Sequence, residues 1–156
     1  MVNIGFTGTQ EGMTPSQKES FGVVWDKIKD TFGEVAEFHH GDCVGADEQA
    51  DSMVSLRFKE SGVGCIVIHP PDNDSKRAWC EGEREEKPLP YLDRNTEIVK
   101  ACDILIAAPK EHDEVLRSGT WATIRRGRKY NKFVVILWPS SGHTWDTFTF
   151  QEMREL

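Results

Sequence analysis

Short apolar runs alternate with longer segments of helical periodicity along most of the chain. The runs typical of strands lie at 2–8, 34–42, 65–70, 103–109 and 132–139. The run at 34–42 is the least apolar, so we expect its strand nearer an edge of the sheet. Between these runs, apolar residues recur at helical spacing in four segments, 14–33, 45–62, 91–102 and 118–131.

The first helical segment also has a clear beginning and end. Thr14 stands before Pro15, and Gln17 follows three residues after Thr14, which predicts a capping box. Gly33 is expected to end this helix, and Gly62 to follow the second one.

Five strand-like runs separated by helices predict an α/β fold. We expect a Rossmann-like doubly wound sheet of about five mainly parallel strands with helices on both faces. The 156 residues suit one domain spanning 1–156. Ligands of such sheets bind beyond the carboxyl ends of the strands. That rule selects the loops at 7–14, 39–47, 69–91 and 108–120.

Two segments lie outside the alternation. Residues 71–90 are polar, charged and bounded by prolines, which is typical of a functional or disordered loop insertion, although Trp79 suggests that part of it packs. In the tail at 140–156, a weak alternation through Trp145, Thr147, Phe148 and Phe150 fits either a short extra strand or a docked tail.

Composition places the chain among globular proteins, with 38% hydrophobic and 29% charged residues. No apolar run approaches the roughly 20 residues of a membrane span, and the N-terminus lacks the basic region of a signal peptide. We therefore expect no membrane partner. The four cysteines form no C-x-x-C pair, and we interpret them as reduced thiols of a cytoplasmic protein: Cys43, Cys65, Cys80 and Cys102.

The formal net charge of −7 argues against a nucleic-acid partner, because such proteins usually carry a basic surface. A small anionic ligand remains compatible with this charge, since backbone amides bind anions without positive side chains.

The first two selected loops are rich in small residues. Gly8 and Thr9 follow the first strand without forming a G-x-G-x-x-G motif, so they predict either close approach to a ligand or a simple turn. The second loop supplies five further ligand candidates, for which a helix cap with a packing glycine is the alternative: Gly41, Asp42, Gly45, Ala46 and Asp47.

A metal site is not favoured in the second loop. His39 and His40 are adjacent to Asp42 and Cys43, but neighbouring strand residues point to opposite faces of a sheet. We predict no metal and no cofactor.

Arg94 and Asn95 fall in the first turn of the third helical segment. An arginine there opposes the helix dipole, which suggests a ligand, while pairing with Asp93 or Glu97 is the alternative.

The fourth helical segment begins at Ser118, a good cap, followed by Gly119 and Thr120, whose amides suit a phosphate. Trp121 is interpreted as core rather than a base-stacking platform. The four cations toward the other end of this helix are interpreted as a solvated face: Arg125, Arg126, Arg128 and Lys129.

Several motifs in this order resemble the SLOG superfamily, and more narrowly its YpsA-related branch of bacteria and phages. They are G-F-T-G-T, F-H-H-G-D-C-x-G-A-D, I-x-I-H-P-P, P-Y-L-x-R-N, D-x-L-I-A-A-P and R-S-G-T-W-x-T-I-R. The resemblance spans roughly 2–139 and implies a nucleotide or nucleotide-derived ligand across the loops above. The superfamily includes LOG-type phosphoribohydrolases and the single-strand-DNA-binding DprA. Its members often form dimers or larger assemblies, which leaves a homo-oligomer open.

The resemblance also raises the question of catalysis. LOG enzymes carry a glutamate three residues after the threonine of their phosphate turn, and Thr123 stands there in this chain. Cleavage of an N-glycosidic bond needs a carboxylate. We name Asp42 and Glu114 as candidate catalytic residues, with Asp47 and Glu111 as further ones. The main hypothesis is a nucleotide-binding protein, the second an N-glycosidic hydrolase of nucleoside monophosphates, and the third single-stranded nucleic-acid binding.

Overall fold

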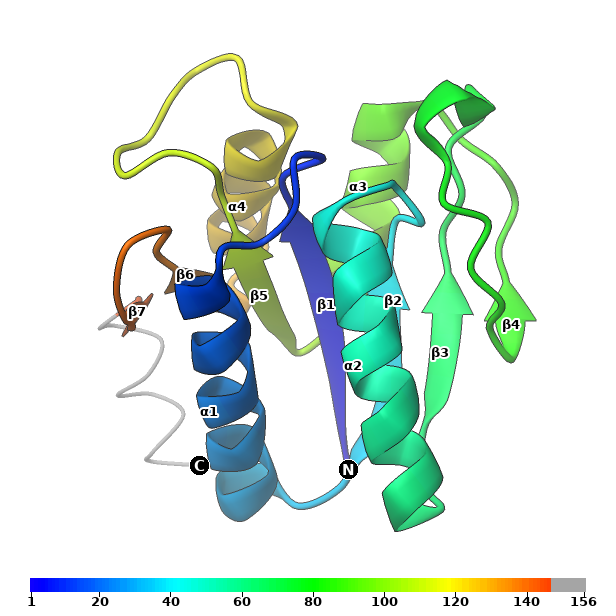
Figure 1. Ribbon diagram of the computed structural model, residues 1–156. Coiled ribbons are helices and arrows are strands. Elements are labelled where there is room, and N and C mark those ends of the chain that lie inside the picture. The colour runs from blue at the N-terminus through cyan, green and yellow to red at the C-terminus, as the bar shows by residue number, and fades with distance from the viewer. Residues whose placement is uncertain (147–156) are drawn as a thin grey trace.

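A seven-stranded sheet forms the centre of the molecule in the computed structural model, which describes residues 1–146 (Figure 1). The strands lie in the order β4 (Arg84–Glu85), β3 (Cys65–Ile68), β2 (Val35–His40), β1 (Val2–Gly8), β5 (Ile104–Ala108), β6 (Phe133–Leu137) and β7 (His143–Trp145). All neighbours pair in parallel except β6 and β7. The predicted Rossmann-like doubly wound sheet is confirmed, with one short strand added at each edge.

Strand β2 lies inside the sheet, between β3 and β1, so the expectation that it lies nearer an edge is wrong. Its polar residues suggest an exposed edge strand, but in the structure they are buried and paired within the protein. His39 hydrogen-bonds Glu37 and His69 on one face, and His40 hydrogen-bonds Asp51 on the other.

Helices cover both faces of the sheet (Figure 1). Helices α1 (Pro15–Phe32) and α2 (Ala46–Ser61) cover one face, and α3 (Tyr91–Ala101) and α4 (Gly119–Lys129) cover the other. The first face packs four aromatic rings together, from Phe6, Phe21, Trp25 and Phe38. On the second face Trp121 and Ile124 of α4 pack against strand residues such as Leu105, which confirms Trp121 as core.

The expected capping box of α1 is present. Thr14 Oγ1 accepts the Gln17 N–H at 3.1 Å, and Gln17 Oε1 accepts the Thr14 N–H at 3.0 Å. Gly33 and Gly62 cap the carboxyl ends of α1 and α2, also as expected.

Residues 71–90 fold into a defined excursion at the β3 edge. It contains a short 3₁₀ helix, Asp74–Lys76, and strand β4. Its two ends are tied together, because Pro71 bridges to Leu89 and the Asp72 N–H donates to the Leu89 carbonyl at 2.8 Å. Trp79 does not pack inward: it is 60% exposed, and the Arg77 guanidinium lies 4.0 Å from its ring centroid.

The strand interpretation of the tail is confirmed for β7, which pairs antiparallel with β6. Thr147, Phe148 and Phe150 lie outside the described residues. Within 1–146 no helix combines the length and apolar character needed to cross a membrane. All four cysteines are free thiols.

Candidate functional site

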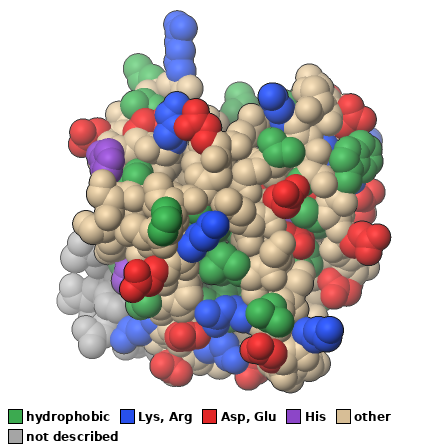
Figure 2. Space-filling view, viewed as in Figure 1, with side chains coloured by type: hydrophobic (Ala, Val, Ile, Leu, Met, Phe, Trp, Pro, Cys, Tyr) green, Lys and Arg blue, Asp and Glu red, His purple; other side chains and the backbone are tan. Residues whose placement is uncertain are grey.

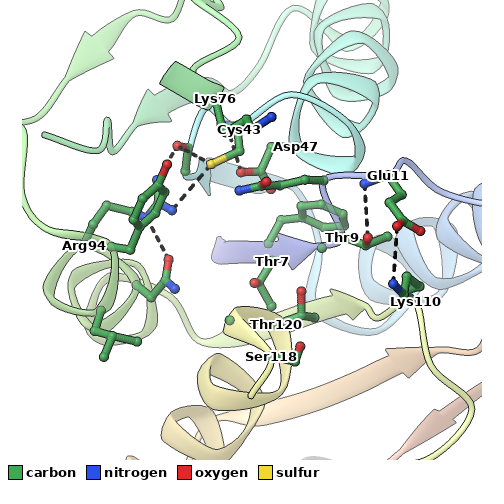
Figure 3. A pocket seen from close by; sticks show the side chains of 18 of the residues that line it. Thr7, Thr9, Glu11, Cys43, Asp47, Lys76, Arg94, Lys110, Ser118 and Thr120 are labelled. Carbon is green, nitrogen blue, oxygen red and sulfur yellow. Dashed lines mark hydrogen bonds and ion pairs between the residues drawn. The ribbon is translucent and has the colours of Figure 1, made fainter. Parts of the chain in front are cut away.

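A cavity of about 640 Å³ opens beyond the carboxyl ends of the strands (Figure 3). It lies where β1 pairs with β2 on one side and β5 on the other, so the strand order runs outward from β1 in both directions. This reversal of strand order is the usual ligand position of doubly wound sheets. The cavity is built from the end of β1, the start of α2, the 3₁₀ segment and the starts of α3 and α4.

The cavity gathers most of the residues predicted to bind a ligand. Those that line it are Gly8, Thr9, Gly41, Asp47, Arg94, Asn95, Ser118, Gly119 and Thr120. Asp42, Gly45 and Ala46 do not line it.

Gly45 and Ala46 instead join the first loop to the second. The Ala46 N–H donates to the Thr9 carbonyl at 3.0 Å. Gly45 has a φ of 90°, and a Cβ there would lie 2.3 Å from the Gln10 carbonyl oxygen. Only glycine therefore fits at position 45, where the second loop crosses the Gln10 carbonyl of the first loop. Its role is to bring the two loops together.

The start of α4 presents unpaired backbone amides to the cavity. Ser118 Oγ accepts the Trp121 N–H at 3.2 Å, which confirms it as the cap. The N–H groups of Gly119 and Thr120 have no acceptor within residues 1–146. Together with the positive end of the helix dipole, these amides can hold an anion.

Two cations on the cavity wall reinforce this end. Lys110 pairs with Glu11 at 3.3 Å, and both residues line the cavity. Arg117 precedes the α4 cap and makes no ion pair with any described residue. Both suit a phosphate group.

Arg94 lies at the wall but is largely engaged by the protein. Its Nε–H donates to Asn95 Oδ1 at 2.7 Å, and Nη1 donates to the carbonyls of Gly41 and His69. Nη2 lies 3.7 Å from Cys43 Sγ. The alternative pairing with Asp93 or Glu97 is not what the structure shows. Arg94 therefore mainly braces the ends of β2 and β3 and has one N–H left for a ligand.

Asp42 is turned away from the cavity and anchors the 71–90 segment. Its Oδ2 pairs with Arg77 Nε at 2.7 Å, and its Oδ1 accepts the Cys80 N–H at 2.8 Å. Both carboxylate oxygens are thus occupied in a fully buried side chain. It does not cap α2, whose N-cap is Gly45.

Glu114, the other candidate catalytic residue, is also absent from the cavity wall. It pairs on the surface with Arg125 at 2.8 Å and with Arg128 at 3.7 Å. The structure does not bring Asp42 and Glu114 together or to the proposed ligand.

The two further candidates, Asp47 and Glu111, do line the cavity, as does Glu11. Glu111 Oε1 accepts the Trp121 Nε1–H at 3.1 Å. Asp47 is 5% exposed; its Oδ2 accepts the Cys43 N–H at 3.2 Å, and its Oδ1 has no partner. Burial raises the pKa of Asp47.

Thr123, which stands where LOG enzymes carry glutamate, is fully buried and does not line the cavity. Its hydroxyl donates to the Gly119 carbonyl at 2.8 Å. The side chain therefore braces the first turn of α4.

Sequence reasoning missed several residues of the wall. Among them are Asn73, Ser75, Lys76, Tyr91, Lys110 and Arg117. All stand in the selected loops at 69–91 and 108–120, so position relative to the strand ends was the available signal. Nothing in their residue types alone distinguishes them from other polar loop residues.

The histidines of the second loop do not meet at one point. His39 and His40 do lie on opposite faces. His40 Nε2, Asp51 and Cys80 come within 4.8 Å of one another. However, His40 Nδ1 accepts the Asp42 N–H, so the ring proton sits on Nε2 and donates to Asp51. Nε2 is therefore occupied by a hydrogen bond.

Surface charge is mixed on the face covered by α1 and α2, and acidic side chains gather over the β3–β4 margin (Figure 2). Exposed Glu81, Glu83 and Glu85 belong to this margin. No continuous basic stripe is visible on this face. That distribution does not favour contact with a nucleic-acid backbone here.

The fold and the cavity define a Rossmann-like α/β protein with a cavity at the switch point of its sheet. Among solved structures, the X-ray structure of TM1055, a target of the Northeast Structural Genomics Consortium, is similar to this chain, with a TM-score of 0.54 and 17% identity. The match covers 97% of this chain and 80% of that one. At this identity the likeness concerns the fold alone. No protein-family model matches the chain, and no curated protein matches it either.

Proposed function

We propose that this chain is a SLOG-type protein that binds a nucleotide or nucleotide-derived ligand at the carboxyl edge of its sheet. The observation that carries the proposal is the convergence of unpaired α4 amides, Lys110 and Arg117 on one cavity at the switch point. An anion held there needs no net positive charge on the whole protein. The resemblance of the sequence motifs to the SLOG superfamily supports the same ligand class.

The rest of the cavity suits the other parts of a nucleotide. Its volume of about 640 Å³ lies within the range of small-molecule sites. Tyr91, Leu92 and Ile98 supply aromatic and apolar surface from α3, on which a base can pack. The phosphate then lies at α4 and the base toward α3.

The first experiment identifies the ligand. The protein is purified without added nucleotide, denatured, and the released small molecules are analysed by mass spectrometry. We expect a phosphate-bearing nucleotide or derivative. Nucleoside monophosphates are then titrated by calorimetry, and failure of all of them together with an empty mass spectrum would reject the proposal.

Position 119 offers a sharper test of the phosphate end. Proline is favoured at the first helical position, and Ser118 has ψ 130, which the residue before a proline prefers. A Cβ at Gly119 meets no atom within 4 Å. Gly119→Pro thus removes one amide donor while keeping the helix, and Gly119→Ala keeps the donor. We expect Gly119→Pro to weaken binding of the best nucleotide roughly tenfold or more, with Gly119→Ala close to the parent chain.

A hydrolase of the N-glycosidic bond is the second candidate. The presence of Asp47 and Glu111 on the cavity wall favours it, because either carboxylate can serve the chemistry. Incubation with nucleoside monophosphates and chromatography for free base tests it. Base release that is lost in Asp47→Asn or Glu111→Gln would make the protein an enzyme; no release leaves binding alone.

Single-stranded nucleic-acid binding is the least supported candidate, given the net charge of −7 and the acidic β3–β4 margin. Tight filter binding of an oligonucleotide with a steep salt dependence would replace the small-nucleotide proposal.

A further inference from the structure

Asp47 carries the one buried side-chain polar atom in the described part of the chain that lacks a hydrogen-bond partner, Oδ1. Such atoms are rare in folded proteins and call for a specific explanation. This one belongs to a residue of the cavity wall rather than to the core. Its position therefore points to a ligand.

The second carboxylate oxygen of Asp47, Oδ2, is held by the backbone. Oδ2 accepts the Cys43 N–H at 3.2 Å, a long bond, and Asp47 stands in the first turn of α2. The positive end of that helix favours the ionised form, and burial opposes it. No cation pairs directly with Asp47 within residues 1–146. A carboxylate in this state gains by accepting a hydrogen bond from a neutral donor.

Asp47 also lies apart from the anion-binding end. Figure 3 shows it across the cavity from Ser118 and Thr120, with Thr7 between them. A ligand with its phosphate at α4 thus extends toward Asp47 with a part that is not phosphate. In a nucleotide the hydrogen-bond donors next to the phosphate are the sugar hydroxyls.

We propose that Asp47 recognises the 2′- and 3′-hydroxyl groups of the nucleotide through its unpaired Oδ1. This inference rests on the proposed function and adds a requirement for a hydroxylated sugar. Oδ1 exposes less than 1 Å². Contact therefore needs a small turn of the side chain toward the cavity, which the long Cys43 bond permits.

The test compares two ligands and two variants of the full chain. AMP, GMP, CMP and UMP are titrated by calorimetry, and the tightest is compared with its 2′,3′-dideoxy analogue. Asp47→Asn keeps the shape of the side chain and an acceptor for Cys43. Asp103→Asn is the matched control, because Asp103 Oδ2 likewise accepts a backbone N–H, that of Asn3, at 2.8 Å. Asp103 directly precedes β5 and so lies at the amino ends of the strands, away from the cavity.

We expect the parent chain and Asp103→Asn to bind the ribonucleotide roughly tenfold tighter than the dideoxy analogue. Asp47→Asn should lose this difference and bind both ligands as weakly as the parent chain binds the dideoxy analogue. Its affinity for inorganic phosphate should equal that of the parent chain. Equal binding of both ligands by the parent would overturn the inference while leaving nucleotide binding intact. An equal loss for both ligands in Asp47→Asn would also overturn it, by reducing Asp47 to a support of the loop. If the parent binds no nucleotide at all, the proposed function and this inference fall together.

Discussion

The guanidinium of Arg94 and the side-chain amide of Asn95, neighbours in the first turn of α3, are joined by a hydrogen bond of 2.7 Å. The same guanidinium donates to the carbonyls of Gly41 and His69, the residues that directly follow β2 and β3. The two residues thus act as a brace between three elements, and this brace shapes one wall of the cavity.

Replacing the brace should cost stability as well as binding. Lysine at position 94 has one ammonium group and cannot reproduce the fork of bonds to Asn95, Gly41 and His69. We expect Arg94→Lys to lower the free energy of unfolding in urea by about 2–4 kcal/mol. Arg57→Lys is the control, since among the described residues Arg57 pairs only with a largely exposed Asp26. It should change the free energy of unfolding by less than about 0.5 kcal/mol. Equal effects of the two substitutions would contradict the brace.

Asp42 should behave as a structural anchor rather than a catalyst. Its φ of 57° lies in the left-handed region, which asparagine tolerates, so Asp42→Asn isolates the loss of charge. Losing the charge of its buried pair with Arg77 should cost about 1.5–3 kcal/mol, because Arg77 keeps its ion pair with Glu85. Hydrogen exchange should speed up at the Cys80 amide, which donates to Asp42 Oδ1, and at the Ala78 amide, which donates to the Asp42 backbone carbonyl. Unchanged exchange there would show that the anchor is not needed.

Gly45 allows a direct test of the loop crossing. Gly45 and Gly33 have similar positive φ values, 90° and 86°, but a Cβ at Gly33 meets no atom within 4 Å. Gly33→Ala should therefore show only backbone strain, about 1 kcal/mol. In Gly45→Ala the new Cβ also collides with the Gln10 carbonyl. The loss of stability measured by thermal unfolding should therefore be at least twice that of Gly33→Ala. Comparable losses of stability in the two variants would mean that the contact between Gly45 and the Gln10 carbonyl relaxes freely.

The pair of His39 and His69 should make the fold sensitive to acid. Burial and the neighbouring His39 and Arg94 lower the pKa of His69 to about 3, whereas an unfolded histidine titrates near 6.5. Between these pH values His69 binds a proton in the unfolded chain but not in the folded chain. The free energy of unfolding therefore falls as the pH drops below 6.5.

His69→Gln should flatten that dependence. From pH 6 to 4.5 we expect it to remove about 2 kcal/mol of the acid-induced loss, measured by denaturation at each pH. Part of the slope should remain, because burial also lowers the pKa of His39. His112→Gln, at an exposed position, is the control and should leave the slope unchanged. A slope unaltered by His69→Gln would show that His69 is not the titrating group.

Local patterns were enough to predict the fold and the placement of the cavity. The alternation of strands and helices gives the sheet, and strand ends then select the loops. Ser118 and Thr14 were predicted as caps because capping depends on residues three positions apart. Each of these features is determined within a short stretch of chain.

The missed features depend on residues far apart in the sequence. The sequence predicts Asp42 as a ligand residue because no local pattern connects it to its partner Arg77, 35 positions away. The sequence predicts Gly45 as a ligand residue because the Gln10 carbonyl approaches it only in the folded chain. Strand β4 has two residues in a charged segment and shows no apolar pattern at all.

The tie between Pro71 and Leu89 makes the segment between them a module with a closed base. Its length and composition can change without moving β3 or α3, because both ends are held at one point. Yet Asn73, Ser75 and Lys76 from this module form part of the cavity wall. Preference for the proposed ligand can therefore diverge by exchange of one surface segment, while the sheet and α4 stay as they are.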